Sequence, residues 1–141
     1  MHNPNARIVA LDIGDKRIGV ATANVVARLA SPLKTLDVSD DVIEQIKQLT
    51  AEQTAAAVVL GLPRNLKGED TDQTRKVREF GERLQHHLDI PIYWQDEALT
   101  SHVSEEKLKS GKTPYQKSDI DALAATYILE DFLASKEELA V

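Results

Sequence analysis

The sequence contains no cysteine, and this absence removes several kinds of chemistry at once. Disulfides, zinc sites built from thiolates and a cysteine nucleophile are excluded, so any bound metal must rest on oxygen or histidine ligands. Aromatic residues make up only 4% of the chain, too few for a platform that stacks the bases of a single strand. The longest apolar runs are well short of the roughly 18 residues of a membrane span, and the N-terminus lacks the apolar core of a signal peptide. We therefore expect a cytoplasmic protein with no membrane association.

Basic residues are also in deficit. The 17 Lys and Arg against 23 Asp and Glu give a net charge of −6, which argues against a protein that holds nucleic acid by bulk charge. A nuclease stays possible, because a metal-dependent active site needs clustered carboxylates and gains positive charge from bound cations. The length of 141 residues and the 42% share of apolar residues predict one domain over residues 1–141.

The order of apolar patterns predicts an α/β fold. Two β-rich runs, 7–13 and 16–22, flank Gly14-Asp15, a pair typical of a hairpin turn. A third strand is expected between residues 28 and 36, at a sheet edge or bulge because it contains Pro32. The remaining elements follow in the order helix, strand, helix, strand, helix, helix: 40–52 (capped by Ser39 or Asp40), 55–60, 72–88, 90–94, 99–108 and 120–133.

This order predicts a five-stranded mixed sheet with helices on both faces. Strands one to three would be antiparallel, and strands one, four and five parallel. In an open sheet of this kind, ligand sites form beyond the carboxyl ends of the parallel strands. All three predicted ends carry polar residues: Asp12, the segment 61–65 and the segment 95–97.

Asp12 is the most informative single residue, because it interrupts the apolar run 8–13 in a predicted central strand. A buried carboxylate is costly unless it is paired or bound to metal. One interpretation is structural: Asp12 caps the turn at Gly14 or pairs with Lys16 or Arg17. The other interpretation is that Asp12 meets two further acids at the sheet edge.

Those two acids, Glu97 and Asp121, also have ordinary structural explanations. Glu97 would suit the N-terminus of a helix, and the segment from Ser118 to Asp121 matches a capping box. On a helix, however, Asp121 shares a face with Ala124 and Ile128 that would turn toward the sheet. Three carboxylates on one rim could hold Mg²⁺ or Mn²⁺, and such ions support the cleavage of phosphodiester bonds.

Two segments carry side chains suited to a phosphate backbone. The loop 61–68 offers Arg64, Asn65 and Lys67, and the stretch 105–117 includes Lys112 and Lys117 in an otherwise acidic protein. Alternatively, the loop 61–68 is an ordinary turn after a strand with solvent-exposed charges, and the stretch 105–117 is a solvent-exposed linker.

Four motifs, taken together, resemble those of the YqgF/RuvX family over nearly the whole chain: LDIGDKRIGVA at 11–21, GLPRNLKG at 61–68, Asp96-Glu97 and DALAA at 121–125. The resemblance implies an RNase H-like fold and a nuclease, a hydrolase of phosphodiester bonds. It implies a role in maturation of the 5′ end of pre-16S rRNA in ribosome biogenesis, with the small ribosomal subunit as a further partner. The family was earlier described as homologous to Holliday-junction resolvases. By the same resemblance, Asp12, Glu97 and Asp121 form the catalytic triad and bind Mg²⁺ or Mn²⁺.

The residues expected to contact the nucleic acid are those of the basic segments and motifs: Lys16, Arg64, Asn65, Lys67, Thr100, Ser101, Lys112 and Lys117. Thr100 and Ser101 match a polar pair of the family, whereas Ala98 stands where the family usually has Arg. Two other functions stay open: a resolvase-like DNA endonuclease and a non-catalytic RNA- or ribosome-binding factor. A nucleotide-binding module of the actin and sugar-kinase type is disfavoured, because those proteins clamp ATP between two domains and 141 residues supply one.

Overall fold

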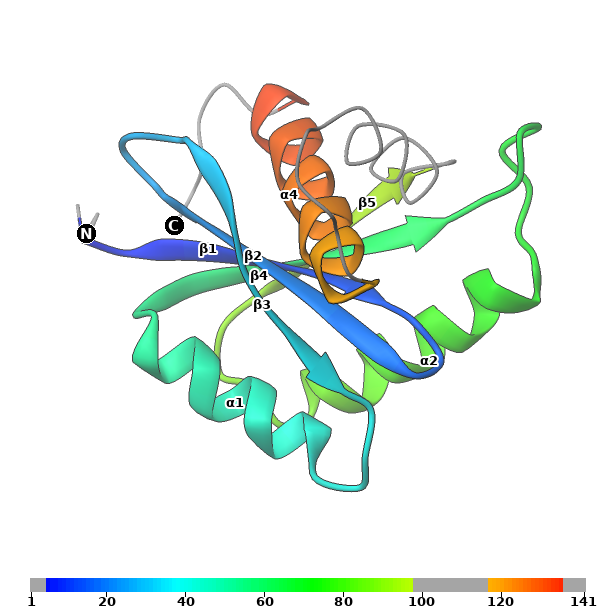
Figure 1. Cartoon of the computed structure of the whole chain (residues 1–141), viewed down its shortest axis with the longest axis horizontal. Coiled ribbons are helices and arrows are strands. Elements are labelled where there is room, and N and C mark those ends of the chain that lie inside the picture. Colours follow the sequence, from blue (N-terminus) through cyan, green and yellow to red (C-terminus); the bar gives the residue numbers. More distant parts are fainter. Residues whose placement is uncertain (1–4, 98–116, 136–141) are drawn as a thin grey trace.

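The computed structural model describes residues 5–97 and 117–135, with side chains from Ile120 onward in the second range. In these ranges one sheet has the strand order β3-β2-β1-β4-β5, and helices cover it on two sides (Figure 1). The elements are β1 (Arg7–Ile13), β2 (Arg17–Asn24), β3 (Ala30–Asp37), α1 (Val42–Glu52), β4 (Ala55–Pro63), α2 (Asp72–Gln85), β5 (Ile92–Glu97) and α4 (Lys117–Ser135).

The sheet is mixed, as the order of elements predicted. β1 pairs antiparallel with β2, and β2 with β3, while β1 pairs parallel with β4, and β4 with β5. Pro32 lies on the edge strand β3, where the register against β2 shifts between Val20 and Ala21. Because proline has no N–H to donate, an edge strand with an irregular register accommodates it. Both expectations for Pro32 are therefore confirmed.

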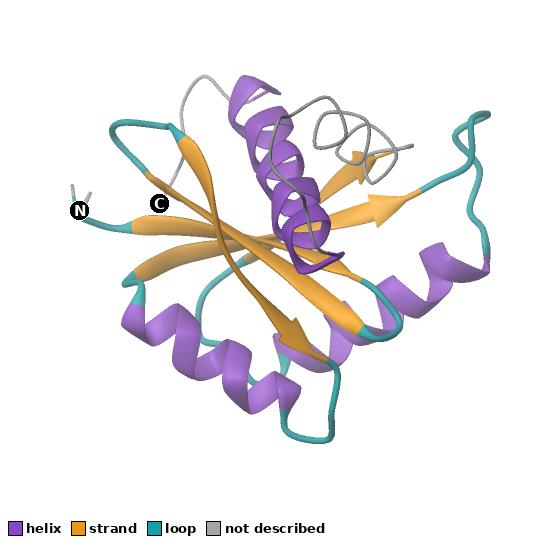
Figure 2. Cartoon of the chain, in the orientation of Figure 1, coloured by secondary structure: helices purple, strands orange, loops and turns teal. Residues whose placement is uncertain are grey.

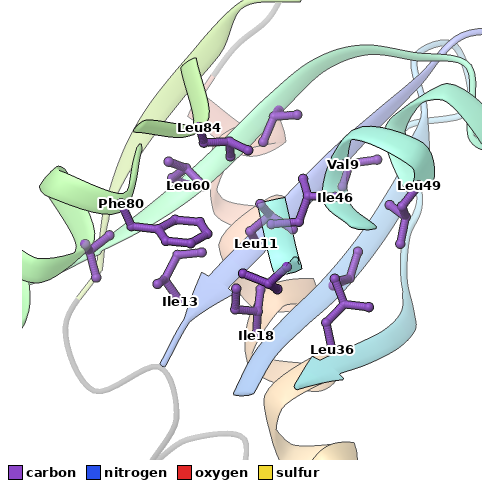
Figure 3. Close-up of a cluster of buried hydrophobic side chains, with 14 of the residues drawn as sticks. Val9, Leu11, Ile13, Ile18, Leu36, Ile46, Leu49, Leu60, Phe80 and Leu84 are labelled. Atoms are coloured by element: carbon purple, nitrogen blue, oxygen red, sulfur yellow. The ribbon is translucent and has the colours of Figure 1, made fainter. Parts of the chain in front are cut away.

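Two apolar cores fill the space between the sheet and its helices. One core lies between the sheet and helices α1 and α2 and includes Leu11, Ile46 and Leu60 (Figure 3). The other lies between the sheet and α4 and includes Ile8 and Ile128. Helices thus cover both faces, α1 and α2 on one and α4 on the other (Figure 2). Because side chains alternate along a strand, Ile8, Ala10 and Asp12 all face α4.

Some boundaries differ from those predicted. The parallel ladder between β4 and β5 continues to the pair Pro63 and Glu97, so both strands extend three residues further than the apolar pattern indicated. The predicted cap of α1 was wrong: its N-cap is Asp41, whose carboxylate accepts from the Ser39 hydroxyl instead of capping the helix. α2 ends at Gln85, three residues early. The helix predicted over 99–108 lies outside the described residues.

α4 is the longest element of the described ranges, so it is the first helix to consider as a membrane span. Neither α4 nor any other helix described here combines the length and apolar character needed to cross a bilayer.

Candidate active site

Asp12 lies at the carboxyl end of β1, directly opposite Gly19 of β2 in the antiparallel ladder. Its side chain is half-buried on the face of the sheet that α4 covers. β1 is the central strand, flanked by β2 and β4, which places Asp12 in the middle of the carboxyl edge. This is the position at which the predicted parallel strands were expected to form a ligand site.

Asp121 reaches this position because α4 crosses β2 at Gly19 with no side chain between them. A β-carbon built on Gly19 would lie 1.8 Å from the main-chain oxygen of Asp121, so only glycine permits the crossing. The face of α4 that follows, with Ala124 and Ala125, is fully buried on the sheet, as its spacing predicted. Since Gly19 is the partner of Asp12, the crossing brings the carboxylates of Asp12 and Asp121 near each other.

Arg17, at the start of β2, forms an ion pair with Asp121. Its Nε donates to Oδ2 of Asp121 over 2.7 Å, and the two side chains are 33% and 23% exposed. The structural interpretation in which Arg17 pairs with Asp12 is therefore wrong, because Arg17 binds the acid across from Asp12. The other candidate partner, Lys16, is exposed in the hairpin turn. Arg17 was missed as a site residue, although its alternation with Gly19 could have placed it on this face.

The electrostatic environment of Asp12 disfavours its charged form. Burial, and to a smaller extent the nearby carboxylate of Asp121, raises the pKa of Asp12 to about 6. Arg17 offsets the charge of Asp121. A positive charge placed between the two carboxylates would therefore be strongly favoured at neutral pH.

Glu97 lies on the same edge and the same face, one strand further away. It is the last residue of β5. The residues after it lie outside the described ranges, so its interpretation as a helix N-terminal acid stays a prediction. Its face follows from Tyr93, whose ring lies 5.5 Å from that of Phe132 on α4, because Tyr93, Gln95 and Glu97 alternate onto one side. β4 separates β5 from β1, which puts two strand spacings, about 10 Å, between the two backbones.

The pair Asp12 and Asp121 fits a hard divalent cation. Both supply carboxylate oxygens, and because Asp12 is buried beside Asp121, a bound cation would stabilise the charged form of Asp12. Within residues 5–97 and 120–135, no three Asp, Glu or His side chains are grouped closely enough to hold an ion by themselves. Mg²⁺ needs no such group, because proteins often bind it through one or two carboxylates together with water and substrate phosphates.

Arg64, the first residue after β4, is tied into the sheet edge. Its Nε donates to Oδ1 of Asp96 over 3.0 Å, and its Nη1 pairs with Asp70. Its main-chain N–H also donates to the carbonyl of Glu97 over 2.9 Å. A phosphate group would have to compete with two carboxylates for this guanidinium, so its predicted phosphate contact remains a prediction.

Asn65 shapes the loop between β4 and α2. Its Oδ1 accepts from the main-chain N–H groups of Lys67 and Glu69, each over 2.9 Å. These bonds turn the loop back on itself, and Gly68 completes the turn with a positive φ of 77°. Lys67 is exposed in this loop, which begins at Arg64 beside Glu97.

The remaining predicted contact residues cannot be placed in the same way. Thr100, Ser101 and Lys112 lie outside the described residues, and only the backbone of Lys117 is described. α4 already includes Lys117, so Ser118 lies inside the helix and not at its cap. The predicted capping box is therefore wrong, and Asp121 accepts its hydrogen bond from Arg17 on the sheet instead.

Comparison with known proteins identifies the family. A family model described as "RuvX: Holliday junction resolvase" matches residues 6–135. The chain belongs to the RuvX family. A RuvX relative from a Sulfurihydrogenibium species, named "Putative pre-16S rRNA nuclease", is 40% identical over 130 residues, covering 91% of this chain and 90% of the relative. A relative of the same name from Rickettsia canadensis is 38% identical over 136 residues, covering 94% and 88%.

Solved structures show the same fold for this RuvX chain. Thermus thermophilus RuvC, in complex with a Holliday junction substrate, matches with a TM-score of 0.57 at 13% identity, covering 92% of this chain and 94% of RuvC. The fowlpox virus Holliday junction resolvase matches with a TM-score of 0.56 at 12% identity, covering 92% and 99%. The predicted RNase H-like fold is thereby confirmed.

Proposed function

We propose that this RuvX chain is a nuclease that hydrolyses phosphodiester bonds with Mg²⁺ or Mn²⁺, and that its substrate is the 5′ region of pre-16S rRNA. The observation that carries the proposal is the pair Asp12 and Asp121 at the carboxyl edge of an RNase H-like sheet. The relatives named as pre-16S rRNA nucleases support the choice of substrate. The cellular setting that we propose is ribosome biogenesis in the cytoplasm, with the small ribosomal subunit as a partner.

Asp12 and Asp121 would hold the cation, and Glu97 would complete the acidic edge from β5. A divalent ion bound there supplies charge neutralisation of the phosphate and activation of water. The residues of the chain would position the two carboxylates. The close crossing at Gly19 fixes the backbone of Asp121, and the hydrogen bond from Arg17 fixes its side chain. Lys67 and Lys16 are exposed on the loops next to this edge and are proposed to contact phosphates of the nucleic acid.

The proposal is tested by a cleavage assay with three substrates: a pre-16S rRNA leader, a four-way DNA junction and an unstructured single-stranded RNA. Each is incubated with Mg²⁺, Mn²⁺ or a chelator. We expect cleavage of the rRNA leader that depends on the divalent ion. Preferred cleavage of the four-way junction would instead support a resolvase, and tight RNA binding without any cleavage would support a non-catalytic factor.

Substitution of Asp12 by Asn separates a catalytic role from a structural one. Cleavage should be abolished while the folded state is kept or stabilised, because the variant removes a carboxylate that burial destabilises. Asp15→Asn is the matched control: Asp15 is an exposed acid in the same hairpin, 3.7 Å from Nζ of Lys76. If both variants cleaved like the wild type, the acidic edge would not be the active site.

A further inference from the structure

Two arginines, Arg17 of β2 and Arg28 in the connection between β2 and β3, hold α4 from opposite ends. Near the start of the helix, Nε of Arg17 donates to the side chain of Asp121 over 2.7 Å. Near its end, Nη2 of Arg28 donates to the main-chain oxygen of Leu133 over 2.6 Å. The two contacts differ in what they fix, because Arg28 binds the helix backbone whereas Arg17 binds a carboxylate of the candidate site.

We propose that Arg17 is a positioning residue of the active site, which holds the Asp121 carboxylate where it can share a cation with Asp12. The inference rests on the proposed function, since it concerns the same carboxylate pair. It adds a residue outside the acidic triad and assigns it a role toward the metal, separate from holding the helix.

The backbone contact at Gly19 shows why the ion pair is not needed to seat the helix. α4 already touches β2 backbone to backbone at Asp121, and the small buried side chains that follow keep it there. What this contact leaves free is rotation of the Asp121 side chain. Repulsion from Asp12 would turn that carboxylate toward solvent, and the hydrogen bond from Arg17 opposes this movement.

The geometry of the ion pair suits such a role. The single bond from Nε engages Oδ2 of Asp121 and leaves Oδ1 for a further ligand within the described surroundings. Both side chains are largely shielded, at 33% and 23% exposure, so water screens the pair less than it screens a surface ion pair. Hydrogen bonds to metal-binding carboxylates orient them, and loss of such a partner typically weakens metal binding about 10- to 100-fold.

The test measures Mn²⁺ binding to the full chain without nucleic acid, by electron paramagnetic resonance of free Mn²⁺. We expect Arg17→Met to raise the dissociation constant by about 10-fold or more. Arg17→Lys should recover part of the affinity, because it keeps a charged donor. Arg28→Met is the matched control: it removes the other arginine that holds α4, and we expect unchanged Mn²⁺ affinity of the folded protein even where the melting temperature falls.

Unchanged or tighter Mn²⁺ binding by folded Arg17→Met would overturn the inference. Arg17 would then only hold the helix on the sheet, or would compete with the metal ion for the Asp121 carboxylate. An equal loss of affinity in Arg28→Met would overturn it too, since general loosening of α4 would then be the cause. Absence of Mn²⁺ binding by the wild type would overturn the proposed metal-dependent function, and the inference with it. Wild-type binding combined with an unaffected Arg17→Met would overturn the inference alone.

Discussion

The main-chain oxygen of Asp121 lies 1.8 Å from the point that a β-carbon on Gly19 would occupy. Gly19 is in turn the ladder partner of Asp12. The contact that packs α4 on the sheet is therefore the same contact that brings the two carboxylates together. Stability and site assembly depend here on one glycine.

Gly19→Ala should damage both properties. The added methyl group meets backbone, which cannot move aside as a flexible side chain can, so we expect a loss of about 2–3 kcal/mol in the free energy of unfolding together with weaker Mn²⁺ binding. Urea unfolding and a Mn²⁺ titration measure the two effects. Gly68→Ala serves as the control: its φ of 77° costs about 1 kcal/mol, but nothing lies within 4 Å and Mn²⁺ binding should be unchanged.

The raised pKa of Asp12 predicts how stability depends on pH in the absence of divalent ions. In the unfolded chain Asp12 ionises near 3.8, and in the folded chain near 6, so the folded state binds its proton more tightly. The contribution of Asp12 to stability is therefore fully present below about pH 4 and is lost as the pH rises through 6. Asp12→Asn should remove this dependence.

Compared with the wild type, Asp12→Asn should accordingly be similar in stability near pH 4 and more stable by about 1–3 kcal/mol near pH 8. The difference in unfolding free energy, measured with urea at several pH values, cancels the other titrating groups. A difference that stays constant between pH 4 and pH 8 would contradict the prediction.

Thr74 links the start of α2 to the end of β4. It is fully buried, its hydroxyl donates to the carbonyl of Pro63, and it forms a reciprocal capping box with Thr71. Thr74→Val keeps the shape but leaves that carbonyl and the N–H of Thr71 without their partner. We expect a loss of about 1–2 kcal/mol in thermal or urea unfolding. Thr54→Val, at an exposed position after α1, should change stability by less.

Lys112 and Lys117 are predicted to bind phosphates of the substrate. Their joint replacement by Ala should weaken RNA binding and reduce the slope of log K against log salt by about 0.7 for each lost contact with a single strand. Arg75 and Lys76 on α2 are the control pair: Arg75 forms an ion pair with Asp72 of the same helix, and Lys76 forms one with Asp15 in the hairpin turn. Equal effects of the two double substitutions would place the binding face elsewhere.

Much of the site could be predicted from strand ends and motifs. Asp12 was identified because a carboxylate within an apolar strand is costly unless it is paired or bound to metal. Asp121 was identified because helical spacing puts it on the buried face of its helix. Glu97 was placed at the correct edge but beyond the end of its strand, since the apolar run stops at Trp94 whereas the hydrogen-bonded ladder continues to Glu97. The apolar pattern of a sequence indicates which residues are buried. A strand can continue beyond its buried residues wherever the neighbouring strand supplies backbone hydrogen-bond partners.

Local patterns in the sequence determined the order of elements, the mixed sheet and the edge that carries the acids, because each depends on residues close together in the chain. Only the tertiary structure decided which charges meet. Arg17 pairs with Asp121, 104 positions away, and not with Asp12, and Arg64 pairs with Asp96 and Asp70. The reason is that ion pairs are set by the close crossing of helix and sheet at Gly19 and by the path of the loop after β4. Neither of these leaves a periodic signal in the sequence.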